Sequence, residues 1–273
     1  MLSKEEITRY SKQLLLPEIG KSGQEKLKNA RVLVVGAGRL GCPVLQYLAA
    51  AGVGTICIVD FDVVDETNLQ RQILYSTNDI GKSKAEIASG KISDLNPFIR
   101  VETVNRKLET TNALNLISNY DIIVDCSDNF ETRYLINDAC VLLDKPFVYA
   151  GIHKFEGQLS VFNYKNSAGG AGPTYRCTFP EMHPEETLLN CSLTGVIGTL
   201  PGIIGTLQAN EVIKMITGLG EICSGKILQM NALTLNFSEI KIKRNEDLWA
   251  DIPKSKEEFI SRNYFQSLSD ISI

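Results

Sequence analysis

The sequence predicts an α/β protein whose Rossmann-like, doubly wound and mostly parallel sheet is extended by antiparallel strands in the C-terminal half. Three observations predict this fold class. Short apolar runs, such as Arg31–Val35 and Asp121–Asp125, are typical of strands buried on both faces. A glycine-rich turn, residues 36–41, follows the first run and leads into an Ala- and Leu-rich helical segment. Strands and helical segments then alternate to about residue 150, which indicates parallel strands joined by helices.

The first half of the chain supplies the parallel strands. Residues 1–30 carry an amphipathic pattern typical of helical segments packed beside the main domain. The predicted strands are Arg31–Val35, Thr55–Asp60, Ile99–Val104, Asp121–Asp125 and Pro146–Tyr149. Helical segments are predicted to end at about Ala51 and to run over Lys82–Leu95 and Phe130–Leu143.

After Gly151 the pattern changes. Polar and apolar residues alternate over Gln158–Tyr164, a helix is predicted at about Gly202–Thr217, and 227–230 with 233–243 resemble an antiparallel pair. The stretch 166–190 is rich in Gly, Pro and polar residues, and a loop of this length is usually functional or disordered. We therefore expect it to be a mobile crossover segment. Residues 245–273 form a charged tail with no strong period.

Composition excludes some classes of partner. A net charge of -4 gives no general attraction to nucleic acid or to anionic membranes, so any phosphate contact requires a local cluster of cations. The N-terminus is polar and charged, and no segment reaches the roughly 20 apolar residues of a membrane span. We expect a cytoplasmic protein that binds neither nucleic acid nor membranes, with its seven cysteines mostly buried thiols.

The glycine-rich turn predicts a phosphate site. Glycines let the backbone approach phosphate closely, and the following helix offers amide donors at its N-terminus. Asp60, about 20 positions further on, is placed to bind a ribose. These features alone also fit an NAD- or FAD-binding oxidoreductase. Cations and carboxylates that follow, including Asp62, Arg71, Lys84 and Asp128, instead favour a triphosphate with a divalent ion.

Several longer motifs carry a family resemblance. The stretches are RYSKQLLLPEIG, GAGRLGCP, DFDVVDETNLQRQ, DIGKSKAE, DCSDNFETRYLIND, GIHKFEGQ and GTLPGIIGTLQANEVIKMITGLG. Together they resemble the MoeB/ThiF adenylyltransferases, relatives of ubiquitin-activating enzymes, from about residue 3 to 244. The resemblance implies a single adenylation domain over residues 1–244.

The resemblance also implies an activity. It is the ATP-dependent adenylylation of the C-terminal glycine of a ubiquitin-fold sulfur carrier ending in Gly-Gly. The molybdopterin synthase small subunit is the favoured carrier, and the thiamine thiazole carrier is the alternative. A further interpretation is that the chain is an inactive dimeric scaffold. A homodimer and a separate sulfur donor are implied as well.

Roles for individual residues follow from the resemblance. Asp60 binds ribose, Asn68 and Arg71 hold ribose and phosphates, Lys84 contacts phosphates, and Asp128 helps to hold Mg²⁺. Arg71, Lys84, Asp128 and Lys12 are the predicted catalytic residues. The full predicted ATP site is Gly36, Gly38, Arg39, Gly41, Asp60, Asp62, Asn68, Arg71, Gln72, Lys84, Asp128 and Asn129.

The chain departs from the family pattern in three features. Lys12 stands where relatives carry an arginine that reaches the triphosphate across the dimer interface, and Arg39 stands where they commonly have glycine. Of the four cysteines that hold a structural zinc in relatives, Cys177 alone remains, so no zinc is expected. Cys191 aligns with a cysteine that joins covalently to the carrier in some relatives, and either a catalytic or an inert role is open.

Overall fold

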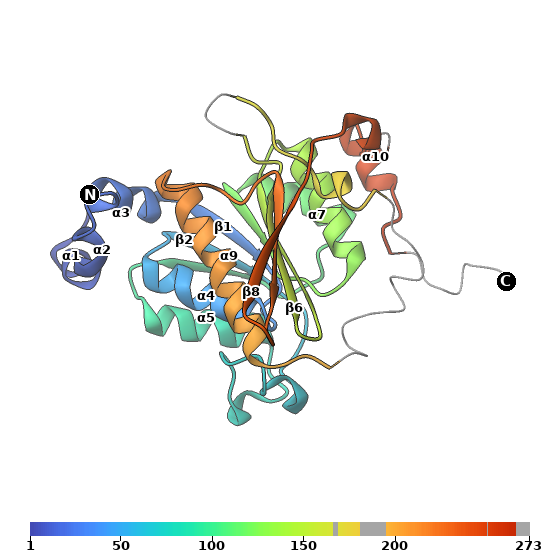
Figure 1. Cartoon of the computed structure of the whole chain (residues 1–273). Helices are drawn as coiled ribbons and strands as arrows, with labels where there is room; N and C mark the ends of the chain where they lie inside the picture. The colour runs from blue at the N-terminus through green and yellow to red at the C-terminus, as the bar shows by residue number, and fades with distance from the viewer. Residues whose placement is uncertain (166–168, 181–194, 250, 266–273) are drawn as a thin grey trace.

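The structure, a computed structural model of the chain, describes residues 1–165, 169–180, 195–249 and 251–265. These residues form one sheet in the order β3-β2-β1-β4-β5-β6-β7-β8 (Figure 1). The strands are β1 Arg31–Val35, β2 Thr55–Val59, β3 Arg100–Val104, β4 Ile122–Asp125, β5 Phe147–His153, β6 Glu156–Phe162, β7 Lys226–Asn231 and β8 Asn236–Lys241. The α-helices are α1 Lys4–Arg9, α2 Ser11–Leu14, α3 Gly20–Asn29, α4 Gly41–Ala51, α5 Lys84–Leu95, α6 Thr110–Ser118, α7 Phe130–Leu142, α9 Thr199–Thr217 and α10 Lys256–Ser261.

The sheet is parallel in its first half and antiparallel in its second. Strands β3, β2, β1, β4 and β5 pair in parallel, and β6, β7 and β8 add to β5 as an antiparallel extension. Helices cover both sides of the sheet (Figure 1). This arrangement confirms the predicted fold class.

Strand β1 illustrates why the sequence folds in this way. Val32 and Val34 face a core cluster that includes residues of α4, α5 and α9, whereas Leu33 and Val35 face a second cluster with residues of α6 and α7. All four are buried, and full burial of a Val or Leu side chain stabilises the fold by about 1.5–3 kcal/mol. A strand that is apolar on both faces is therefore held at the centre of the sheet.

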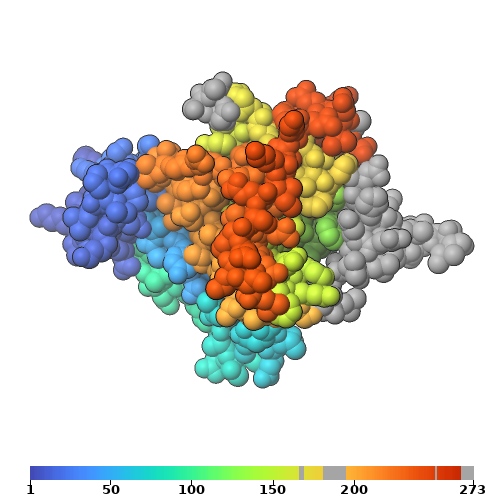
Figure 2. Space-filling view, in the orientation of Figure 1, coloured from blue at the N-terminus to red at the C-terminus, as the bar shows by residue number. Residues whose placement is uncertain are grey.

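The N-terminal helices pack against one edge of the domain. The ammonium of Lys26 in α3 donates to the carbonyl oxygen of Thr217 at the end of α9, at 3.0 Å. Tyr10 is 4% exposed, and its hydroxyl accepts a hydrogen bond from Asn96 Nδ2 at 2.8 Å. In the space-filling view these helices stand out from the body of the molecule (Figure 2).

Some elements differ from the predicted ones. Helix α6 was not expected, because its sequence TTNALNLIS contains few strong helix formers. Helix α9 begins at Thr199, before the predicted start, and β5 continues to His153 because β6 pairs with it along its whole length. The end of β5 is thus set by its pairing with β6 rather than by local sequence alone.

The charged tail is fixed to the domain over its described part. Phe259 of α10 is fully buried and Tyr264 is 2% exposed, and both belong to the cluster around α6 and α7. Tyr264 donates to Asp138 of α7, which also binds Arg176 from the described part of the crossover segment. The tail thus buries apolar side chains although its sequence shows no period.

Candidate active site

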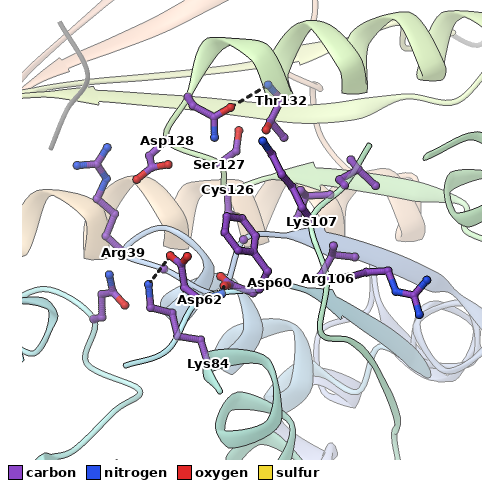
Figure 3. A pocket seen from close by; sticks show the side chains of 18 of the residues that line it. Arg39, Asp60, Asp62, Lys84, Arg106, Lys107, Cys126, Ser127, Asp128 and Thr132 are labelled. Carbon is purple, nitrogen blue, oxygen red and sulfur yellow. Dashed lines mark hydrogen bonds and ion pairs between the residues drawn. The ribbon is translucent and has the colours of Figure 1, made fainter. Parts of the chain in front are cut away.

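A pocket lies at the carboxyl ends of the parallel strands, where the chain leaves β1 and β4 (Figure 3). This is the switch point of the sheet, since β2 lies on one side of β1 and β4 on the other. The lining residues are Val35, Gly36, Gly38, Arg39, Val59, Asp60, Phe61, Asp62, Arg71, Gln72, Lys84, Arg106, Lys107, Leu108, Cys126, Ser127, Asp128, Asn129 and Thr132. Five cationic and three anionic side chains are among them, so the pocket is positive in a chain whose net charge is -4.

The glycine loop is shaped by two close approaches of the backbone. Gly36 has a φ of 98°, and a Cβ there would lie 2.7 Å from the carbonyl oxygen of Cys126. A Cβ on Gly41 would lie 2.1 Å from the carbonyl oxygen of Gly36. Helix α4 begins at Gly41 with no side-chain cap, which leaves amide donors at its N-terminus for an anion.

Asp60 stands directly after β2 and is held by the backbone. Its Oδ2 accepts from the amide of Ala37 at 2.7 Å, and its Oδ1 accepts from the amide of Asp62 at 2.8 Å. Burial raises the pKa of Asp60, and these two hydrogen bonds oppose the rise. The carboxylate is therefore oriented against the glycine loop, and each oxygen keeps a lone pair for a further donor such as a ribose hydroxyl.

Lys84 and Arg71 bring positive charge to the same pocket. The Lys84 ammonium, on a side chain only 7% exposed, forms an ion pair with Asp62 at 2.9 Å. Arg71 Nη1 donates to the carbonyl oxygen of Thr67 at 2.6 Å. Burial, and next the nearby charge of Arg39, lower the pKa of Arg71. Like charges held this close favour a polyanionic ligand.

The loop after β4 carries Asp128 between two fixed neighbours. Ser127 donates to Asp125 Oδ1 twice, from its amide at 3.0 Å and from its hydroxyl at 2.6 Å. Asn129 caps α7 by accepting from the amide of Thr132 at 2.9 Å (Figure 3). Asp128 itself is exposed at the pocket and lies beside Arg39 in the same view. The loop thus presents a carboxylate on a rigid turn.

Most of the predicted ATP site is brought together here, with two exceptions. Gly41 packs against Gly36 without lining the pocket, and Asn68 forms a reciprocal cap with Asp65. The nucleotide roles of the individual residues stay predictions. Lys12 lies on α2 away from the pocket lining, so its predicted action across a subunit interface also stays a prediction. Cys191 lies outside the described residues.

Nine residues of the lining were not among the predicted site residues: Val35, Val59, Phe61, Arg106, Lys107, Leu108, Cys126, Ser127 and Thr132. A signal for three of them was present, because residues 106–108 follow β3, which pairs in parallel with β2. Carboxyl ends of neighbouring parallel strands meet at one edge of the sheet. Lys107 also lies over the ring of Phe265, 3.8 Å from its centroid, which links the pocket wall to the tail.

Within the described ranges, no group of three or more His, Cys, Asp or Glu side chains is arranged to hold a metal ion. Cys177 instead accepts hydrogen bonds from the amides of Thr174 and Asn245, each at 3.4 Å. The expectation of no family-type zinc stays a prediction.

None of the helices in the part of the chain that the structure describes is long and apolar enough to cross a membrane.

Comparison with known proteins decides the family. A model of the ThiF family matches residues 10–250. The chain belongs to the ThiF family. It is 47% identical over 243 residues to a sulfur carrier protein adenylyltransferase of Thermus thermophilus, a match that covers 89% of this chain and 90% of the relative. It is 49% identical to a probable adenylyltransferase/sulfurtransferase MoeZ of Mycobacterium tuberculosis, of which it spans 62%.

Solved structures agree with this family assignment. The structure of Escherichia coli MccB with ATP matches with a TM-score of 0.75 and 26% identity, covering 89% of this chain and 73% of MccB. MccB with the peptide MccA and AMPCPP matches with a TM-score of 0.74. Together with the named relatives, these matches confirm the predicted family, fold and enzyme class, which is that of the adenylyltransferases.

Proposed function

We propose that this chain uses ATP to adenylate the C-terminal glycine carboxylate of a ubiquitin-fold sulfur carrier, with release of pyrophosphate. One observation carries the proposal: a positive pocket at the switch point joins a glycine loop, a helix N-terminus and an exposed carboxylate. The Thermus thermophilus relative, named for the same activity, supports the choice of a sulfur carrier. The molybdopterin synthase small subunit is the proposed carrier, in molybdenum cofactor biosynthesis, and a separate protein supplies the sulfur.

The adenylylation reaction requires the carboxylate to be positioned against the α-phosphate and positive charge to surround both. A C-terminal carboxylate has a pKa of about 3.5, so it is already an anion at neutral pH and needs no general base. Its oxygen attacks the α-phosphorus, and the bond from that phosphorus to the bridging oxygen breaks with its electron pair leaving on pyrophosphate. Arg71 and Lys84 offset the repulsion between the two anions. The ion pair of Lys84 with Asp62 holds the ammonium in place before the nucleotide enters.

The residues present fit a magnesium ion bound together with the nucleotide. Mg²⁺ usually takes one or two carboxylates and completes its coordination with phosphates and water. Asp128 supplies an exposed carboxylate at the pocket, and Asp62 is a second within the lining. The ion would neutralise phosphate charge, and Asp128 is the residue proposed to hold it.

A homodimer is part of the proposal. An apolar groove between α4, residues 70–73 and α9 is lined by Pro43, Tyr47, Ile73, Ile197 and Ile203, among others. Tyr47 is 53% exposed and Ile73 64% exposed, so a second copy of the chain would remove sizeable apolar area from water. Sedimentation of the wild type and of Ile73→Asp tests this contact, and a monomeric wild type would argue against it.

ATP–pyrophosphate exchange tests the activity. Each carrier of the host that ends in Gly-Gly is added in turn with Mg²⁺, and exchange with the molybdopterin carrier is expected. Exchange with the thiamine carrier alone would instead favour the thiamine pathway. Arg71→Ala and Asp128→Asn should each lower exchange about 100-fold or more. Arg100→Ala and Asp94→Asn, at exposed sites outside the pocket lining, are the matched controls. No exchange with any carrier would contradict the proposal.

A further inference from the structure

We propose that Arg39 binds the β- and γ-phosphates of ATP and stabilises the departing pyrophosphate from within the same chain. The inference rests on the proposed adenylylation and adds a residue that selects the triphosphate. Arg39 belongs to the glycine loop between β1 and α4 and lines the pocket. A glycine loop ordinarily binds phosphate through backbone amides, so a long cation in it adds a second means of recognition.

The first observation is that Arg39 is buried without a partner. Its side chain belongs to a residue only 8% exposed, and its Nε is buried with no hydrogen bond. Across the described ranges Arg39 forms neither a hydrogen bond nor an ion pair with another side chain or the backbone. A buried charge without a counter-ion is costly, and native structures rarely keep one that has no use. An anion in the pocket would remove that cost.

The second observation is that two neighbouring cations already have polar partners, although the Nε of Arg71 is also buried without one. Lys84 is paired with Asp62, and Arg71 donates to the Thr67 carbonyl oxygen. Arg39 therefore offers five N–H donors in a planar fork that none of its described neighbours uses. Such a fork binds two phosphate oxygens at once, which a lysine ammonium cannot do in the same way.

The third observation concerns where Arg39 lies along the pocket. In the view of Figure 3, Asp60 lies between Arg106 on one side and Arg39 with Asp128 on the other. Asp60 is the expected ribose ligand, because it directly follows β2 and faces the glycine loop. A phosphate chain that leaves this ribose along the glycine loop runs toward Arg39 and Asp128. The end of the triphosphate then meets the fork of Arg39.

This position gives Arg39 a role in the reaction. As the bond between the α-phosphorus and the bridging oxygen breaks, its electron pair moves onto pyrophosphate and the negative charge there increases. A cation already fixed at that point stabilises the transition state more than the ground state. AMP lacks both terminal phosphates and would leave Arg39 unpaired. We therefore expect Arg39 to distinguish ATP from AMP.

Calorimetric titration of Arg39→Ala and Arg39→Lys with AMPCPP and with AMP, in the presence of Mg²⁺, tests this role. Loss of hydrogen bonds to a charged group predicts that Arg39→Ala binds AMPCPP about 10- to 100-fold more weakly, while AMP affinity changes less than about threefold. Arg39→Lys should recover part of the loss, and Arg100→Ala should bind as the wild type does. Pyrophosphate exchange by Arg39→Ala should fall by a similar factor through kcat.

Thermal unfolding without nucleotide separates this role from a structural one. Because Arg39 is an unpaired buried cation, Arg39→Met should melt at or above the wild-type temperature. A lower melting temperature together with equal losses for AMPCPP and AMP would overturn the inference. So would an unchanged ratio of the two affinities in Arg39→Ala. A wild type that binds neither nucleotide would instead overturn the proposed function, and this inference with it.

Discussion

Asp138 of α7 joins three distant parts of the chain, and removing its carboxylate should weaken the whole domain. The side chain is fully buried and accepts from Arg176 Nε at 2.8 Å, from Arg176 Nη2 at 2.9 Å and from the Tyr264 hydroxyl at 2.7 Å. Arg176 belongs to the described part of the crossover segment, and Tyr264 to the tail. Breaking this network therefore tests whether the tail supports the domain.

The structure sets the size of each effect. Asp138→Ala leaves Arg176, whose side chain is 5% exposed, without its counter-ion, and loss of one partner from a buried pair costs about 3–5 kcal/mol. Tyr264→Phe removes one hydrogen bond to a carboxylate, about 1.5–3 kcal/mol, and we expect the lower value because Arg176 still pairs with Asp138. Against a typical stability of about 5–15 kcal/mol, both losses are measurable.

Urea unfolding at a fixed protein concentration measures these changes. The two variants share one carboxylate, so the double variant should cost less than the two single losses together, by about 0.5–3 kcal/mol. Tyr164→Phe removes a hydroxyl outside this network and is the matched control. Additive losses, or a Tyr264→Phe variant no weaker than the control, would refute the idea that Asp138 ties the tail to the domain.

Three further predictions concern the start of α4, the turn that contains Asp79 and the turn after β4. Gly41→Ala places a Cβ 2.1 Å from the carbonyl oxygen of Gly36. We therefore expect the variant to be largely insoluble or to melt many degrees lower than the wild type in thermal unfolding. A wild-type melting temperature would show that the backbone relaxes this contact easily. Hydrogen bonds from Lys91 and next from Ser76 lower the pKa of Asp79 to about 2, below its unfolded value of about 3.8. The stability that Asp79 contributes is therefore present above pH 3.8 and is lost as the pH falls toward 2. Unfolding wild type and Asp79→Asn at a series of acid pH values measures the difference in their free energies of unfolding. A difference that stays constant with pH would contradict this prediction. Ser127→Ala removes a 2.6 Å hydrogen bond to the buried Asp125 and loosens the turn that carries Asp128. The Mg²⁺ concentration that gives half-maximal ATP–pyrophosphate exchange should therefore rise several-fold. An unchanged concentration would mean that the backbone alone fixes the turn.

Much of the fold could be predicted because its signals are local. The strand Arg31–Val35 is apolar at every position after the first, and a strand of that kind is stable only between two layers of helices. Gly36 and Gly41 are required because a Cβ at either position would lie too close to a backbone carbonyl oxygen, 2.7 Å from that of Cys126 and 2.1 Å from that of Gly36. Such constraints can be recognised from a few neighbouring residues of the sequence.

The lining of the pocket was predicted only in part, because proximity across strands is not a local property. Asp60 and Asp128 were expected from motifs that follow β2 and β4. Arg106 and Lys107 follow β3 with no motif around them, and they reach the pocket only because β3 pairs with β2. The distance of Asn68 from the lining likewise depends on how residues 66–68 turn.

The sequence alone determined the fold class, the family and the set of charged residues from which an adenylation site can be built, since buried strands, tight glycine turns and long motifs are each encoded over a few neighbouring residues. Only the tertiary structure decided which of those charges already have partners. Lys84 is paired with Asp62, Arg176 is paired with Asp138, and Arg39 has no partner among the described residues although it is 92% buried. Pairing depends on distances between side chains far apart in the chain, and burial sets the cost of a charge left without a partner.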